Sequence, residues 1–263
     1  MSYYTSISGL KNAQTDLNTI SHNIANAETN GFKKSRVDFA DIVASSASTN
    51  PKMVQGIGSA VESITQNFGI GPMEQTGAAL DVAITGDGFF EIKSPDGGTM
   101  YTRNGSFAID DTGFINDGSG NRLQSMTGDI QVAASKPNVD PTKPDATFTG
   151  ITISSQGVVN ASYSDGTNDD LGTIALATFL APSGLKQVGS SNWEATGLSG
   201  EAVRGTPDSG ANGALLSGSI EHSNVDIAEE LVNLITAQRY FQANAKAIDT
   251  ATQISQTIIG LRS

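Results

Sequence analysis

The side chains best suited to acid–base or metal chemistry are few in this sequence. Its two histidines, His22 and His222, lie far apart and have no carboxylates at metal-ligand spacing around them. The absence of cysteine excludes a thiolate nucleophile, a disulfide and a cysteine-based metal site. We therefore expect neither a metal centre nor thiol chemistry.

The acidic and glycine-rich segments in the middle of the chain also lack a catalytic pattern. Asp110–Gly113 and Asp165–Asp170 do not have the spacing of a calcium loop with its closing glutamate, and both predict turns instead. Gly86–Gly88 has neither the Lys-Ser/Thr ending of a phosphate loop nor dinucleotide-binding spacing, and no serine lies in a Gly-x-Ser-x-Gly elbow. We expect a protein that is not an enzyme and needs no cofactor.

The balance of charge narrows the range of partners. The chain carries 15 Lys and Arg against 27 Asp and Glu, a formal net charge of −12, with the acidic residues scattered. It lacks the basic surface with which proteins bind nucleic acids and anionic membranes. No apolar run has the length of a membrane span, and the N-terminus does not resemble a signal peptide. We expect no nucleic-acid binding, no membrane insertion, and any export by a route without a cleaved signal.

The only dense basic cluster lies just after the first predicted helix. Lys33, Lys34 and Arg36 follow Asn30–Gly31, which predicts a left-handed helix stop. The cluster either contacts acidic groups of a neighbouring subunit or forms a solvated helix end. Its contrast with so acidic a chain favours the subunit contact.

Both ends of the chain carry apolar residues at helical spacing. From Tyr3 to Ile24 they recur every seven residues, and from Ile227 onward they alternate by three and four. This spacing places one apolar stripe along each helix and is typical of helices that pack on other helices. Asp226 lies three residues before Glu229, the spacing of a capping box at the start of the second helix.

The segment between the helices predicts β structure. Short apolar runs alternate with turn residues, and Asn104–Gly105 predicts a hairpin turn between residues 101–103 and 106–109. The proline-rich segment 130–148 is not expected to form a central strand. Residues 37–42 predict one or two helical turns.

We therefore predict an α+β fold in which the terminal helices pair as a coiled-coil domain, with a central all-β domain and an extended linker arm. The arm covers residues 44–58, where small and polar residues dominate. The predicted domains are 1–31 with 222–263 for the paired helices, 32–67 for the basic connector and arm, and 68–221 for the β domain.

Three blocks of the sequence, in the same order along the chain, carry motifs of one protein family. They cover residues 6–33, 76–107 and 223–239. Their motifs resemble those of the bacterial flagellar rod and hook axial proteins, and the resemblance covers the chain apart from about 44–55 and 130–185.

Within that family the resemblance favours the hook subunit. The segments that carry this preference are Gly31–Asp41, Ile64–Phe68 and Trp193–Thr196. Hook subunits usually contain inserted outer domains, for which only residues 130–148 could stand in here. The resemblance therefore implies a minimal hook subunit, with the distal rod subunit, the drive shaft of the basal body, as the alternative.

The resemblance implies that the flagellar type III export apparatus secretes the chain unfolded and that identical copies then form a hollow tube. It implies contacts with the distal rod protein, the hook cap protein and the hook–filament junction protein. Ordering the termini on assembly costs about 1–2 kcal/mol of backbone entropy per residue, which apolar burial must offset. The residues expected at the assembly interface are Leu10, Leu17, Ile20, Ile24, Asn26, Phe32, Lys33, Lys34, Arg36, Leu231, Leu234, Gln238, Phe241 and Ile248.

Without the resemblance, the residues leave other interpretations open. The helical stripes also suit an ordinary helical hairpin in a monomer. The Gly-, Asn- and Thr-rich strands also suit a monomeric β-rich adhesin or carbohydrate-binding module on a helical stalk.

Overall fold

The computed structural model describes residues 2–43, 56–138 and 145–260 and has an α+β fold, as the sequence predicts. The chain divides into two compact units, a helical unit and a β unit. The helical unit comprises Met1–Ala27, Lys34–Asn67 and Val225–Ser263, and the β unit comprises Glu28–Lys33 and Phe68–Asn224. None of the helices in the described ranges combines the length and apolarity that crossing a bilayer requires.

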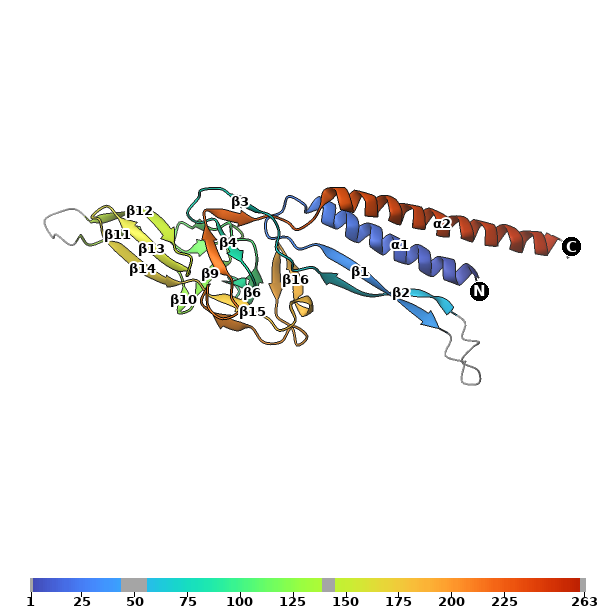
Figure 1. Ribbon diagram of the computed structural model, residues 1–263, viewed down its shortest axis with the longest axis horizontal. Helices are drawn as coiled ribbons and strands as arrows, with labels where there is room; N and C mark the ends of the chain where they lie inside the picture. The colour runs from blue at the N-terminus through green and yellow to red at the C-terminus, as the bar shows by residue number, and fades with distance from the viewer. Residues whose placement is uncertain (1, 44–55, 139–144, 261–263) are drawn as a thin grey trace. The chain divides into compact units, whose positions relative to one another are not determined.

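The helical unit contains two long helices that lie side by side (Figure 1). They are α1 (Ser2–Ala25) and α2 (Ile227–Gly260), and they confirm the terminal helices predicted from the sequence. Asp226 caps α2, because its carboxylate accepts hydrogen bonds from the backbone N–H groups of Ala228 and Glu229 at 2.8 and 3.1 Å.

The two helices run antiparallel. Asn23 near the end of α1 bonds Glu230 near the start of α2, and Gly9 near the start of α1 faces Asn244 farther along α2. A Cβ at Gly9 would lie 2.6 Å from the side-chain oxygen of Asn244, so the absence of a side chain allows this close approach.

Two strands complete the helical unit and correct one expectation. Residues 37–42, expected to be helical, belong to β1 (Ser35–Val43), which pairs antiparallel with β2 (Gly56–Gln66). The cause is pairing with a segment more than twenty residues away, such as Val37 with Ile64, which local propensity does not reveal. Most of the expected linker arm, 44–55, lies outside the described residues.

The β unit is built on antiparallel pairs. Its larger sheet has the order β16-β17-β6-β5-β9-β8-β7, with β10 beside β9 and β15 between β5 and β18. Its strands are β5 (Phe89–Lys93), β6 (Thr99–Thr102), β7 (Ala108–Ile109), β8 (Ile115–Asn116), β9 (Arg122–Ser125), β10 (Gly128–Asp129), β15 (Leu176–Thr178), β16 (Lys186–Gly189), β17 (Asn192–Glu194) and β18 (Val203–Gly205).

A second sheet of the β unit has the order β11-β12-β13-β14, and two further pairs are β19-β4 and β20-β3. A short 3₁₀ helix, η2 (Pro182–Gly184), follows β15. The strands are β3 (Met73–Gln75), β4 (Val82–Thr85), β11 (Ser135–Lys136), β12 (Ala146–Ile153), β13 (Val158–Tyr163), β14 (Asn168–Thr173), β19 (Ala214–Ser217) and β20 (Ser219–Glu221). Strand β12, which lies between β11 and β13 in its sheet, begins inside the proline-rich segment, so the expectation for that segment is wrong at its C-terminal end; residues 139–144 lie outside the described ranges.

The β unit has two apolar clusters. The larger is formed by buried aliphatic and aromatic residues of both sheets, including Phe90, Leu123 and Val159. The smaller surrounds the fully buried Trp193, against which Phe89 packs edge to face with ring centroids 5.9 Å apart. Trp193 is a core residue of the β unit.

The hairpin predicted at Asn104–Gly105 is wrong. Strand β6 ends at Thr102 and pairs with β5 and β17, whereas β7 pairs with β8. Gly105 instead packs against β4, where its carbonyl accepts a 2.9 Å hydrogen bond from Val82 N–H. Any Cβ at Gly105 would overlap the carbonyl oxygen of Val82, so close backbone approach is the reason for this glycine.

The turns predicted at the acidic segments are confirmed at Asp110–Gly113 and at Asp165–Thr167, whereas Asn168–Asp170, also expected in the second turn, begin strand β14. Asp110 accepts hydrogen bonds from the backbone N–H and hydroxyl of Thr112 at 2.8 and 2.7 Å, and Asp165 binds Thr167 in the same way. These bonds lower the pKa of both aspartates, with the side-chain bond to the threonine as the largest cause. In the part of the chain that the structure describes, no three metal-ligating side chains gather into a metal site.

We predict that Gly105→Ala destabilises the β unit by about 1–3 kcal/mol, because the added methyl must displace backbone. Denaturant unfolding of the full chain, followed by the fluorescence of its single tryptophan, measures this. Gly150→Ala is the matched control, since a Cβ there meets nothing within 4 Å. Equal stability of the two variants would contradict the packing explanation.

Candidate assembly surfaces

A buried polar cluster joins α1, β1 and α2 within the helical unit. The Asn23 side chain donates to Ser35 O at 2.8 Å and to Glu230 Oε2 at 3.0 Å, and its oxygen accepts from Ser35 N–H at 2.9 Å. Lys34 Nζ pairs with Glu230 at 2.9 Å and with the more exposed Glu229 at 3.2 Å. Asn23 thus satisfies both backbone groups of Ser35, which fixes where β1 starts against α1.

The electrostatics of this cluster depend on Glu230. Burial alone would lower the pKa of Lys34, but its hydrogen bonds and charge interactions with Glu230 and Glu229 outweigh that effect and raise it. Burial, and then the charge of Glu230, raises the pKa of the nearby Asp16. These residues line a polar hollow of about 240 Å³ beside Asn233.

A second buried ionic cluster lies in the β unit, centred on Glu221. Its carboxylate accepts from Lys33 Nζ at 2.6 Å and from Gly71 N–H at 2.8 Å, and its other oxygen lies 3.5 Å from Arg103 Nη1. Lys33 also donates to Gly69 O at 2.8 Å. We call these five residues the Glu221 cluster. The side chains of Lys33 and Glu221 are both 0% exposed.

The charges in the Glu221 cluster depend on one another. Burial lowers the pKa of Lys33 and of Arg103, and the carboxylate of Glu221 opposes both shifts. The backbone adds to the cluster, because Gly31 N–H donates to the carbonyl of Glu221 at 2.8 Å. A buried carboxylate with this many donors holds segments that are distant in the sequence.

The basic cluster expected to face a neighbouring subunit is divided by these contacts. Lys33 is enclosed in the β unit, so an internal ion pair replaces the subunit contact expected for it. Lys34 pairs within the helical unit. The side chain of Arg36 is 74% exposed and 3.0 Å from Asp38, and for Arg36 a subunit contact remains a prediction.

The other residues expected at the interface differ in exposure. Ile20 and Phe32 are buried in their own chain, and Leu231 and Gln238 are exposed on α2. The half-buried ones are Leu10, Leu17, Ile24, Asn26, Leu234, Phe241 and Ile248. Half-buried apolar residues on a packed helix pair are suited to further contacts.

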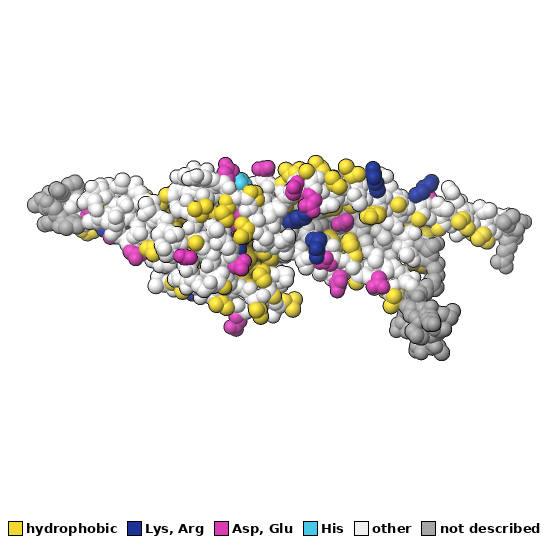
Figure 2. Space-filling model, in the orientation of Figure 1, with side chains coloured by type: hydrophobic (Ala, Val, Ile, Leu, Met, Phe, Trp, Pro, Cys, Tyr) yellow, Lys and Arg dark blue, Asp and Glu magenta, His cyan; other side chains and the backbone are white. Residues whose placement is uncertain are grey.

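The helical unit exposes more apolar surface than the predicted stripes account for. Figure 2 shows apolar side chains along the helices. On α2 they include Val232, Ile235 and Tyr240, which lie off the predicted stripe. Apolar residues on more than one helix face were the available indication of additional packing partners.

The hairpin β1–β2 and the end of α2 are exposed in the same way. The hairpin presents Phe39, Ile42, Val43, Ile57, Val61 and Ile64. The antiparallel pairing brings the start of α1 opposite residues near 250 of α2, so Ile254, Ile258 and Ile259 extend past it and are exposed.

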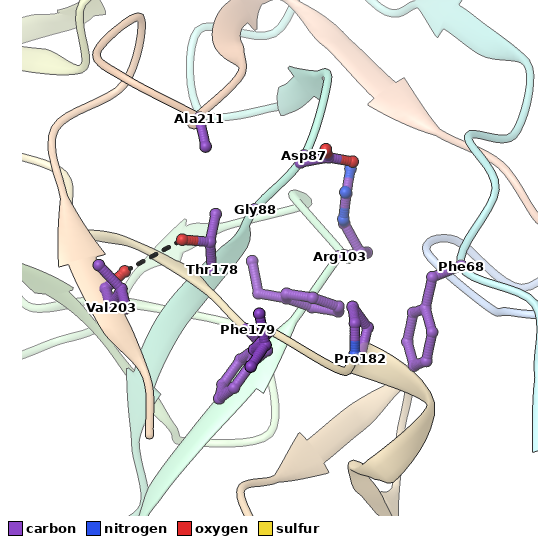
Figure 3. A pocket seen from close by; sticks show the side chains of 11 residues that line it. Phe68, Asp87, Gly88, Arg103, Thr178, Phe179, Pro182, Val203 and Ala211 are labelled. Atoms are coloured by element: carbon purple, nitrogen blue, oxygen red, sulfur yellow. Dashed lines mark hydrogen bonds between the residues drawn. The ribbon is translucent and has the colours of Figure 1, made fainter. Parts of the chain in front are cut away.

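The β unit has an apolar hollow of about 470 Å³ (Figure 3). Phe68, Phe179, Pro182 and Val203 line it, and the rim residue Leu180 is 95% exposed. Two of its polar side chains have structural partners: the Thr178 hydroxyl donates to Val203 O at 3.4 Å, and Arg103 donates to Gly86 O at 2.9 Å. This lining suits an apolar side chain better than a reacting substrate.

These features define a class of protein. Exposed apolar side chains on a long helix pair, together with buried ion pairs in structural roles, are typical of a structural subunit that packs against other chains.

Comparisons with known proteins agree with that class. Residues 4–33 match the family described as flagella basal body rod protein, 83–161 the flagellar hook protein FlgE/F/G D1 domain, and 216–261 the flagellar basal body rod FlgEFG protein C-terminal region. The chain is 39% identical to the flagellar basal-body rod protein FlgG of Bacillus subtilis, over 99% of this chain and 98% of that protein. It is 35% identical to FlgG of Buchnera aphidicola, over 98% of each chain, and 28% identical to the flagellar hook protein FlgE of Salmonella typhimurium, over both whole chains.

The chain therefore belongs to the flagellar rod and hook axial protein family. It is a structural protein of the bacterial flagellum and not an enzyme, which confirms the resemblance and the expected absence of catalysis.

We predict that Glu230→Ala weakens the helical unit far more than Glu229→Ala. Removing the 1% exposed Glu230 leaves Asn23 and Lys34 without their buried partner, at a cost of about 3 kcal/mol. Removing the 60% exposed Glu229 costs less than about 0.5 kcal/mol. Hydrogen exchange of peptides covering 20–37, in assembled full-length chain, measures the difference, and similar exchange in both variants would refute it.

Proposed function

We propose that the chain is the subunit of the distal rod, the drive shaft of the flagellar basal body. The observation that carries this proposal is its end-to-end similarity to proteins named as basal-body rod proteins, with an alignment of 274 positions against the 263 residues of this chain. The hook protein, favoured by the sequence analysis, is the weaker candidate. Its alignment needs 410 positions at 28% identity.

The described part of the β unit supports the rod. Strands β10 to β15 follow one another with short connections, apart from residues 139–144, and all join the two sheets of the same unit. An outer domain like those of hook subunits would need a much longer insertion. The hook remains an alternative because the domain that residues 83–161 match is described for hook and rod proteins together.

Assembly in this proposal proceeds through the terminal helices. They pair as a coiled coil, and the predicted interface residues together with the exposed apolar positions of α2 pack on other copies. The chain passes unfolded through the flagellar export apparatus without a cleaved signal, and its helices order on assembly outside the cytoplasm. Its partners are further copies and the export apparatus. The hook cap and hook–filament junction proteins belong to the hook alternative.

Genetic complementation tests this proposal. We predict that expressing the chain in Bacillus subtilis lacking its FlgG rod protein restores completed rods in electron micrographs and some motility. As the control, the same chain is expressed in a strain lacking the hook protein, where we expect that it does not restore hooks. Hooks in the second strain and no rods in the first would establish the hook alternative instead.

Polymerisation of the purified chain tests the role of the helices. We predict that Leu17→Asp lowers the yield of sedimenting tubes at least about tenfold, because a carboxylate would be buried without a partner. Asn18→Asp, at the exposed neighbouring position, should assemble normally. Trp193 fluorescence shows whether the β unit stays folded in each variant. Normal assembly of Leu17→Asp would rule out this interface.

A further inference from the structure

The Glu221 cluster lies where the chain joins and leaves the β unit. Residues 28–33 bring the chain from α1 into this unit, and Asn224 is its last residue before α2. Gly31 and Lys33 on the incoming side both bond Glu221 on the outgoing side. The two ends of the β unit are therefore tied directly to each other.

The contact between Lys33 and Glu221 links two points of the chain directly, without the residues between them. Lys33 and Glu221 are 188 residues apart in sequence, and their side chains meet at 2.6 Å with no solvent exposure. The returning segment after β2 is held at the same place, because Gly69 accepts from Lys33 and Gly71 donates to Glu221. Tension applied through the terminal helices reaches Glu221, the last residue of β20, through Lys33 and Gly31 before it reaches the two larger sheets.

We propose that the Glu221 cluster is a tension-bearing clasp, which keeps the β unit closed when force acts through α1 and α2. The clasp resists opening because its site excludes water. The two charges must be pulled apart before water can hydrate them, so the ion pair is lost before hydration compensates for it. While it holds, the helices can open and re-form with the β unit intact. Once it opens, up to 188 residues come under load, on the order of 600 Å of extended chain. The clasp serves a rod or a hook subunit equally, so it does not rest on that distinction.

Single-molecule pulling of the full chain tests the clasp. The chain has no cysteine, so Tyr4→Cys and Gln256→Cys give unique attachment points at exposed positions of α1 and α2. The antiparallel helices should unzip first at low force, followed by one long step as the β unit opens. At constant force, we expect Lys33→Met to shorten the lifetime of the closed β unit about 100-fold.

Two controls separate the clasp from general stability. Lys136→Met removes another 2.6 Å ion pair of the β unit, with Asp169, and should leave the lifetime under terminal tension nearly unchanged. Handles at Asp96→Cys and Thr149→Cys load the β unit without loading the clasp, and there Lys33→Met should have little effect.

Equal shortening of the lifetime in both pulling geometries would overturn the proposal, as would equal effects of Lys33→Met and Lys136→Met. If Lys33→Met does not fold, Glu221→Gln takes its place, because the amide oxygen still accepts from Gly71 while the charge is lost. A lifetime of Glu221→Gln under terminal tension equal to that of the unmutated chain would also refute the clasp.

Discussion

The buried carboxylate of Glu221 determines how several segments of the β unit pack together. A buried charge is costly unless its partners are complete, and a buried ion pair is weak evidence for net stability. In this protein, the buried ion pair contributes to conformational specificity, because it favours one arrangement of the segments over others. Lys33, Gly71 and Arg103 satisfy the carboxylate together, and they come from three separate segments. An alternative packing that displaced Lys33 or Arg103 would remove a charged partner of the buried carboxylate, and one that displaced Gly71 would remove a hydrogen bond, so the arrangement of these segments is strongly determined.

The adjacent lysines show how two similar residues are given different roles. Lys33 belongs to the β unit and pairs with Glu221, whereas Lys34 belongs to the helical unit and pairs with Glu230. Because each lysine is fixed by a buried glutamate of its own unit, one of the places where the chain crosses between the units falls at the peptide bond that joins them. A one-residue shift would move one lysine into the other's place and leave one of the two buried glutamates without an ammonium partner.

The sequence predicts the parts of this fold that depend on local pattern. The two helices, the Asp226 cap and the turns at Asp110 and Asp165 follow from periodicity or from a side chain that bonds its own backbone. The predictions that were wrong share a different cause, which is pairing between residues distant in the sequence. Strand β1 and the packing of Gly105 on Val82 depend on partners distant in the sequence, and short-range propensity favoured a helix and a hairpin there.

The candidate surfaces divide in the same way. The half-buried helical residues were identified by their spacing, but Glu221 and Glu230 were not recognised as buried charges. Acidic residues at the start of a helix have a sufficient local explanation in the helix dipole, so nothing in the pattern pointed to Lys34 as a partner of Glu230. The exposed apolar residues of the β1–β2 hairpin were missed because the strand pair itself was missed.

The preference for a hook subunit had a related origin. Two of the segments that carried it, Gly31–Asp41 and Ile64–Phe68, contribute Lys33 to the Glu221 cluster and form much of the β1–β2 pair. The third contributes Trp193 to the core of the β unit. Residues with such structural tasks support the shared architecture and do not by themselves separate a hook subunit from a rod subunit. Hook subunits usually differ from rod subunits by chain inserted between the shared elements. Between β10 and β15, the residues that the structure describes form strands β11 to β14 of one four-stranded sheet and their turns, which is consistent with the rod proposed above.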